Sequence, residues 1–182
     1  MKRLLASMAL LFAISSAHAS MIWRAVAVDS AQLDGLTKNE ELLARTLLAT
    51  KGDQAINLDK AWHGIHFLLN GTAWKVTSTA GQAVLGGREF GADMGYGPPR
   101  VVSKEDVVKV AKALSMITSK ELSARYSPKI MEEEDIYPSS TWQQEGPQAL
   151  KFLLDGYAEL LAFYQRAAKN GSMPFRVEFD IR

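Results

Sequence analysis

The chain has 182 residues, with 21 lysines and arginines against 20 aspartates and glutamates, and it contains no cysteine. A formal net charge of +1 provides no electrostatic footprint for nucleic acid, so we expect no nucleic-acid partner. The lack of thiols excludes thiol catalysis, thiolate zinc sites and iron–sulfur clusters.

The first 19 residues show the three parts of a secretion signal in their usual order. Lys2 and Arg3 supply a positive start, residues 4–14 form a short apolar run, and Ala17-His18-Ala19 carries the small residues that signal peptidase recognises. A spanning helix needs about 20 apolar residues, which disfavours the alternative of an uncleaved anchor. We predict cleavage after Ala19, a periplasmic or secreted location, and no stable membrane insertion once the signal is removed. Removing 19 residues from 182 leaves 163, enough for one domain.

The first half of the mature chain predicts one strand followed by three helices. The apolar run 22–28 is typical of a strand, and Asp29 and Asn39 are suited to cap helices over 31–36 and 39–48. Residues 53–57 indicate a turn, and 58–70 a helix that Gly71 closes. The stretch 80–99, with six glycines and two prolines, predicts an irregular loop in which 83–85 forms an interrupted strand.

The second half predicts several helices and a final strand. An extended pair at 101–102 precedes a helix opened by Ser103 and Asp106, and shorter helices follow at 119–126 and from 127 to 136. A long helix covers 147–169. In the last strand Phe175, Val177, Phe179 and Ile181 alternate with Arg176, Glu178, Asp180 and Arg182, which predicts one buried and one solvent-facing side. Because no βαβ order repeats, we predict a single α+β domain over 20–182, with a small mixed or antiparallel sheet packed with several helices.

The predicted helix 58–70 is apolar on nearly every side except for one polar line. Asp59, His63, His66 and Asn70 form this line, and a buried helix must satisfy such groups internally or line a hydrated cleft. Three interpretations stay open: core histidines bonded to other groups, one wall of a binding pocket, or a metal site on His63 and His66. The metal interpretation lacks an identifiable third ligand, so we predict no metal and no cofactor.

The glycine-rich stretch contains Gly95-Tyr96-Gly97, but two prolines follow and no helix begins directly after it. This order disfavours a phosphate-binding loop. A more plausible ligand site is an ordered loop that brings Tyr96 and Arg100 to the helix opened by Ser103. There Arg88, Arg100 and Lys104 could hold a carboxylate. We favour the alternative, a structural loop whose arginines face solvent.

Three stretches together resemble the YfbM-like family of bacterial proteins. They are LDKAWHGIHFLLNG at 58–71, GYGPPRVVSKEDV at 95–107, and IYP at 136–138 with LLDGYAELLAFYQRAAKNG at 153–171. The resemblance extends from Met21 to the final strand and implies a compact α+β domain, without an established reaction, substrate or cofactor. Typical members start at the first strand as cytoplasmic proteins, whereas this chain carries an export signal. The candidate pocket residues within or near these motifs are Asp59, Trp62, His63, His66, Tyr96, Arg100, Tyr137 and Trp142.

No decisive catalytic signature is present, and we favour a non-enzymatic binding or interaction domain of the periplasm. Its pocket or surface would be built from residues 59–70 and 95–100, and would take a small ligand or a protein partner. One form of this hypothesis is an immunity-type protein that blocks a toxin. The alternative is a hydrolase or metal-dependent enzyme centred on His63 and His66.

Overall fold

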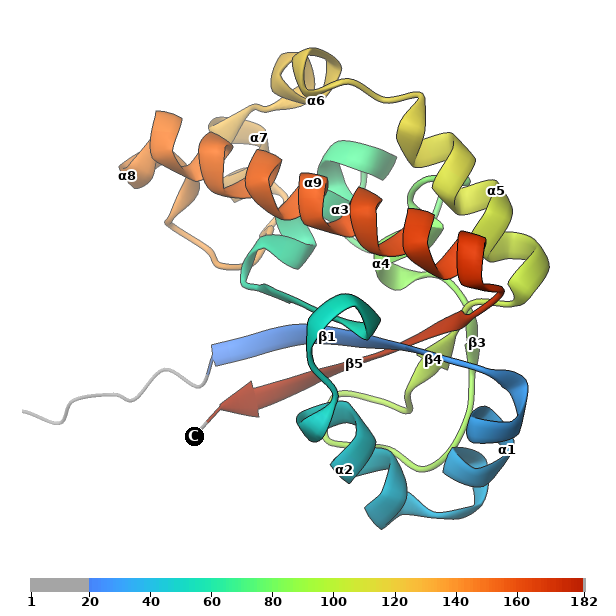
Figure 1. Ribbon diagram of the computed structural model, residues 1–182. Helices are drawn as coiled ribbons and strands as arrows, with labels where there is room; N and C mark the ends of the chain where they lie inside the picture. Colours follow the sequence, from blue (N-terminus) through green and yellow to red (C-terminus); the bar gives the residue numbers. More distant parts are fainter. Residues whose placement is uncertain (1–19, 182) are drawn as a thin grey trace, which may run out of the picture.

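The structure, a computed structural model that describes residues 20–181, combines one sheet with helices on both of its faces (Figure 1). The predicted leader, residues 1–19, lies outside the described residues. The elements are β1 (Ser20–Val28), α1 (Ser30–Lys38), α2 (Glu40–Ala49), the 3-10 turn η1 (Gly52–Gln54), β2 (Ala55–Asp59), α3 (Ala61–Asn70), α4 (Gln82–Leu85), β3 (Arg88–Glu89), β4 (Arg100–Val101), α5 (Lys104–Ser115), α6 (Ser119–Arg125), α7 (Pro128–Glu133), α8 (Trp142–Glu145), α9 (Pro147–Asn170) and β5 (Met173–Ile181). The predicted α+β class is confirmed.

The five strands lie in the order β2-β1-β5-β4-β3, and every neighbouring pair is antiparallel. The first and last strands occupy the centre of the sheet, where they pair from Ser20 opposite Ile181 to Val28 opposite Met173. Central strands are buried on both faces when both faces are covered. This position of β5 decides what surrounds its charged residues.

Helices cover the two faces of the sheet unequally (Figure 1). The short helices α1 and α2 lie against one face, where Val26, Phe175 and Val177 form a separate apolar cluster with the leucines of these helices. The larger cluster lies on the other face, between the sheet and α3, α5 and α9, and includes Trp23 and Ala25. The predicted caps are present: Asp29, Asn39 and Ser103 each accept a backbone N–H of the helix that follows.

Helices α3 and α9 pack against each other through two glycines. A Cβ atom at Gly64 would lie 2.6 Å from Leu153 Cδ2, and one at Gly156 would lie 3.0 Å from Ile65 Cδ1. A larger side chain at either position would force the facing side chains to shift, so the two glycines allow the helices to approach closely. The close contact explains why α3 is buried along nearly its whole length.

The structure corrects three of the predicted elements. Residues predicted as a turn form strand β2, so α3 begins at Ala61, and Asp59 lies at the strand end with a φ of 47° instead of on the helix. The sequence pattern that indicates β2 is a two-residue alternation, in which buried Ile56 and Leu58 alternate with exposed Asn57 and Asp59. The predicted strand piece at 83–85 belongs to the short helix α4.

The third correction concerns the last strand. The face carrying Arg176 and Glu178 was predicted to meet solvent, yet Arg176 is only 5% exposed. The alternation of β5 is real, but the α3–α9 layer covers its polar face while α1 and α2 cover the apolar one.

Candidate functional site

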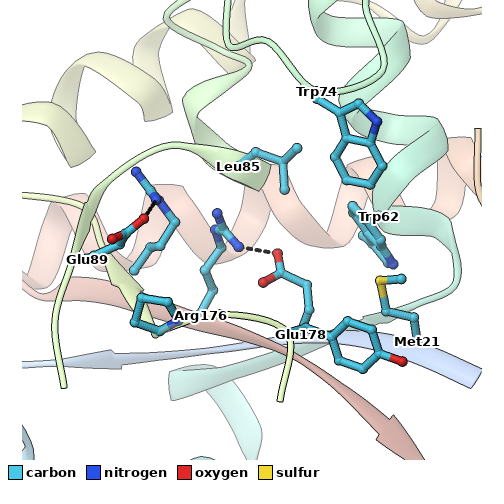
Figure 2. Close-up of a pocket in the computed structure, with 11 residues that line it drawn as sticks. Met21, Trp62, Trp74, Leu85, Glu89, Arg176 and Glu178 are labelled. Atoms are coloured by element: carbon cyan, nitrogen blue, oxygen red, sulfur yellow. Dashed lines mark hydrogen bonds and ion pairs between the residues drawn. The ribbon is translucent and has the colours of Figure 1, made fainter. Parts of the chain in front are cut away.

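A pocket of about 330 Å³ lies between the polar face of the sheet and the covering helices (Figure 2). Five residues of the sheet line it: Met21, Glu89, Arg100, Arg176 and Glu178. The remaining walls come from α3, from the loop 71–79 that follows it, from α4 and from the segment before β4. They consist of Trp62, Trp74, Leu85, Tyr96, Gly97 and Pro98. The site therefore combines a charged floor with largely apolar walls, a composition common among ligand sites.

Two ion pairs form the charged floor. On β5, Arg176 Nη1 donates to Glu178 Oε1, and both side chains point into the pocket (Figure 2). On the neighbouring strands, Arg100 Nη1 donates to Glu89 Oε1 at 2.5 Å. The Arg100 Nε and Nη2 groups also donate to the Gly87 carbonyl, at 3.1 and 2.7 Å. Both arginines thus have a carboxylate partner.

Arg100 and Arg176 are direct partners in the β4–β5 register, so two guanidinium groups emerge side by side from one face. Like charges in such positions repel each other. Burial lowers the pKa of Arg176, the Glu178 carboxylate opposes this, and the Arg100 charge lowers it further. Since arginine remains protonated in proteins, the site retains a buried cation. The Nε atom of Arg176 is buried without a hydrogen-bond partner.

The Glu178 carboxylate lies between Arg176 and Trp62 (Figure 2). Its side chain is 14% exposed. Burial raises its pKa, while the charge of Arg176 acts in the opposite direction. The carboxyl group thus depends on the guanidinium beside it to stay ionised at this depth.

An aromatic stack forms the wall opposite the ion pairs. The ring of His63 contacts both indoles, with centroids 4.7 Å from Trp62 and 4.4 Å from Trp74, and the two indoles also contact each other at 6.2 Å. Tyr137 also stacks on Trp62, at 6.2 Å. Trp62 is buried with Nε1 unpartnered, whereas Trp74 is 62% exposed at the pocket mouth. The wall therefore offers an open indole face to a ligand.

His63 uses both ring nitrogens to hold this wall together. Nε2 donates to the Ala73 carbonyl at 2.7 Å, and Nδ1 accepts the Tyr137 backbone N–H at 2.9 Å. Burial lowers its pKa, and only the bond to Ala73 opposes that effect. A neutral ring with both nitrogens occupied matches the core-histidine interpretation and leaves no nitrogen for a metal.

His66 and Asn70 connect α3 to the loop 71–79. Asn70 Nδ2 approaches His66 Nδ1 at 3.1 Å, while Asn70 Oδ1 accepts the backbone N–H groups of Thr77 and Ser78 at 2.9 and 3.2 Å. A Cβ at Gly81 would come within 1.9 Å of Asn70 Oδ1, so only glycine leaves room for this clamp. The clamp holds the loop that carries Trp74.

The second ring nitrogen of His66, Nε2, is buried without a hydrogen-bond partner of ordinary geometry. Burial, followed by electrostatic interactions with His63 and Arg176, lowers the pKa of His66 to about 4, and a hydrogen bond to the Lys75 backbone acts in the opposite direction. His66 is therefore neutral at physiological pH and adds no charge behind the pocket.

The structure brings together three of the eight predicted site residues. Trp62, Tyr96 and Arg100 line the pocket, and His63, His66 and Tyr137 lie outside its lining, with His63 and Tyr137 stacked on Trp62. Asp59 is exposed at the end of β2. Trp142 instead lines a separate cavity of about 360 Å³ and donates from Nε1 to the Ile136 carbonyl at 2.7 Å.

The strand register argues against the less favoured interpretation, in which Arg88, Arg100 and Lys104 together hold a carboxylate at the Ser103 helix. Arg88 is opposite Val101 in the β3–β4 register while Arg100 is opposite Glu89, so the two arginines project from opposite faces. In the glycine-rich segment, the backbone N–H groups of Gly95 and Gly97 donate to Asp93 Oδ1 at 2.7 and 3.1 Å. An internal carboxylate therefore organises this loop.

Sequence reasoning missed Met21, Trp74, Leu85, Glu89, Arg176 and Glu178 as pocket residues. The charged pair of β5 was visible as alternation, and only the position of β5 at the sheet centre converts it into a buried floor. Across residues 20–181, no group of three or more histidines, aspartates or glutamates is arranged to hold a metal ion. Within that same range, no helix combines the length and apolar character needed to cross a membrane.

Comparisons with known proteins identify the family to which this α+β domain belongs. A family model described as "Domain of unknown function (DUF1877)" matches residues 20–173, and the chain belongs to this family. The structure is similar to the crystal structure of YfbM from Escherichia coli, described as a protein of unknown function, with a TM-score of 0.72 and 23% identity over 87% of this chain and 100% of that chain. The resemblance to the YfbM-like family is thereby confirmed, and at this identity the structure supports a shared fold. No curated protein matches the chain.

Proposed function

We propose that this protein is an exported binding protein and that the pocket over β5 is its ligand site. The observation that carries the proposal is Arg176, a guanidinium that is 5% exposed, lines the pocket and has its Nε unpartnered. Buried polar groups are normally paired, so an unused donor at a pocket floor favours a function over a purely structural role. A ligand acceptor that reached this floor would complete its hydrogen bonding.

The walls support the same proposal because they are fixed in advance. Asn70 holds Thr77 and Ser78, and His63 holds Ala73, so the loop that carries Trp74 is bound at both ends. A ligand that enters a preformed site avoids the entropy cost of ordering the loop. An exposed tryptophan on such a loop is therefore suited to contact a ligand.

Export is supported by the leader features and by the extent of the family match. The match begins at residue 20, and the positive, apolar and small-residue parts of the leader all precede it. These features support a location in the periplasm or outside the cell. The mature domain then works where soluble ligands from the surroundings arrive.

A protein partner, as in the immunity-type form, is the second candidate. The observation that favours it is the apolar rim, because Trp74 is 62% and Tyr96 45% exposed. Exposed aromatic residues are enriched at interfaces between proteins. The hydrolase or metal alternative gains no comparable support, since His63 has both nitrogens occupied and His66 is buried.

The four tryptophans provide an experiment that tests the ligand site directly. Trp62 and Trp74 line the pocket, whereas Trp23 and Trp142 donate to the carbonyls of Val84 and Ile136. In a ¹⁵N-labelled sample, titration with the neutral probe 3-phenylpropan-1-ol should shift the Nε1–H signals of Trp62 and Trp74. The signals of Trp23 and Trp142 should stay in place.

Trp74→Ala should weaken binding of this probe at least about tenfold, because an aromatic contact is removed. Phe152→Ala is the matched control, since Phe152 is an exposed aromatic side chain beside the separate cavity of Trp142. A shift confined to Trp142, or no shift of Trp62 and Trp74, would refute the ligand site. Recovery of one stoichiometric periplasmic protein that protects Trp74 would instead support the partner candidate.

A further inference from the structure

Resting on the proposed function, we infer that the pocket takes a small zwitterion, namely an α-amino acid with an apolar side chain. The inference comes from the arrangement of charges on the floor and from the chemistry of the walls. Such a ligand carries both charges on groups attached to one carbon atom, and the floor likewise presents opposite charges close together in its two ion pairs.

The floor is neutral in total but strongly polar. Arg176 and Arg100 are adjacent in the sheet, and their carboxylate partners Glu178 and Glu89 also line the pocket. A ligand with only a negative charge would meet two carboxylates, and one with only a positive charge would meet two guanidinium groups. A ligand that carries both charges can place each against its opposite.

The positions of the side chains suggest which charge goes where. The unpartnered Nε of Arg176 and the neighbouring Arg100 provide the donors for a ligand carboxylate. Glu178 lies between Arg176 and Trp62, so it can accept from an ammonium group that also contacts the indole face (Figure 2). The ligand orientation follows, with the carboxylate toward β4 and the ammonium toward α3.

The apolar walls then receive the side chain of the amino acid. Trp62, Trp74 and Leu85 face this part of the pocket, and Met21 lies beside Trp62 (Figure 2). The volume of about 330 Å³ is at the small end of ligand sites, which span about 300–1,000 Å³. This volume suits a single amino acid better than a long peptide.

Four probes that share one phenyl group test the inference on the unmodified mature protein. They are L-phenylalanine, 3-phenylpropionate, 2-phenylethylamine and 3-phenylpropan-1-ol, and calorimetry with the Trp62 and Trp74 signals measures their dissociation constants. L-Phenylalanine should bind about tenfold more tightly than either singly charged probe, because each charge-assisted contact adds to the affinity. Equal affinity for 3-phenylpropionate or 2-phenylethylamine overturns the zwitterion inference and leaves the ligand site standing. Failure of all four probes to shift Trp62 and Trp74 overturns both.

Variants of the floor residues test which of them contacts the carboxylate of the ligand and which contacts its ammonium group. Arg100→Gln should bring the affinity for L-phenylalanine within about threefold of that for 2-phenylethylamine, since the carboxylate contact is weakened. Arg88→Gln is the matched control, because it makes the same change on the opposite face of the next strand. Glu178→Gln should remove the preference over 3-phenylpropionate, whereas Glu89→Gln, which changes the partner of Arg100 on the carboxylate side, should leave that preference in place. Equal losses in Arg88→Gln and Arg100→Gln would contradict the assignment.

Discussion

The two faces of the central strand β5 are both buried, but they are buried in different ways. Phe175 and Val177 pack into an apolar cluster under α1 and α2, where nothing but shape and hydrophobic area is required. One residue along, Arg176 and Glu178 face the α3–α9 layer and form the floor of a pocket. The first face stabilises the fold, whereas the second holds charge that water would otherwise solvate.

This difference shows that alternation along a strand does not by itself distinguish core from solvent. Alternation indicates that the two faces of a strand meet different environments. The number of helical layers packed on the sheet determines whether each face is buried or meets solvent. A two-layer protein would leave Arg176 in water. Here a second helical layer encloses it, and enclosure turns an ordinary surface pair into a site where electrostatic interactions are strong.

The largest expected effect comes from the apolar face. Phe175→Ala should lower the free energy of unfolding by about 4 kcal/mol, because a buried aromatic ring is replaced by a cavity. Urea unfolding measures this loss. If the faces are independent, the indole signals of Trp62 and Trp74 keep their positions in the folded variant, and a change in them would show that the two clusters are coupled.

The next effect tests the polar face. Glu178→Gln should cost about 3 kcal/mol, since it leaves Arg176 as a buried cation beside Arg100. Glu89→Gln removes a more exposed partner of Arg100 and should cost less than about 1 kcal/mol.

Replacing the buried pair together, as Arg176→Met with Glu178→Met, should restore most of the stability and abolish binding of L-phenylalanine. Urea unfolding of the unmodified protein, of Glu178→Gln, of Glu89→Gln and of the double variant measures these differences in stability. Similar losses for Glu178→Gln and Glu89→Gln would mean that the enclosure of the polar face has no energetic consequence.

The pH dependence of stability tests the burial of His66, which lies behind the pocket. The pKa of His66 is lowered from 6.5 to about 4, so the unfolded chain binds a proton there before the folded protein does. Stability is therefore lost as the pH falls from about 6.5 toward 4. His66 should account for a loss of about 2 kcal/mol between pH 7.5 and pH 5.

His66→Gln should reduce this loss by most of that amount, with the remainder including His63, whose pKa is lowered in the same direction. Unfolding in urea at both pH values gives the comparison. If the loss of stability between pH 7.5 and pH 5 were the same in His66→Gln as in the unmodified protein, the pKa of His66 would not be lowered by folding.

The smallest effect on stability is expected at the pocket mouth. Trp74→Ala should change the free energy of unfolding by less than about 1 kcal/mol, because the side chain is mostly exposed. The same change should nevertheless abolish most of the probe binding. A loss of several kcal/mol would assign Trp74 to the fold, along with the His63 stack, instead of to the site.

Much of the fold could be predicted from local pattern. Capping residues marked the starts of α1, α2 and α5, and a long apolar stripe marked α9. Strand β2 was missed because the polar line through Asp59, His63 and His66 suggested a single helix, although Asp59 belongs to the strand end.

The site was less predictable because its residues come from distant parts of the chain. Arg100 and Trp62 were recognised within their motifs, yet Arg176 was placed in solvent, since strand order is not encoded in local periodicity. Trp74 lies in a polar loop and gave no periodic signal at all. Its role depends on the Asn70 clamp, which requires the loop to fold back on α3.

Met21 connects the pocket with the proposed cleavage site of the leader. Its backbone N–H donates to the Tyr137 hydroxyl at 3.0 Å, and its side chain lines the pocket. If the leader is removed after Ala19, the new chain terminus forms at Ser20, one residue and about 3.3 Å of strand from the pocket wall. Cleavage would then add a positive amino group at the edge of the site, so precursor and mature protein would differ in affinity for charged ligands.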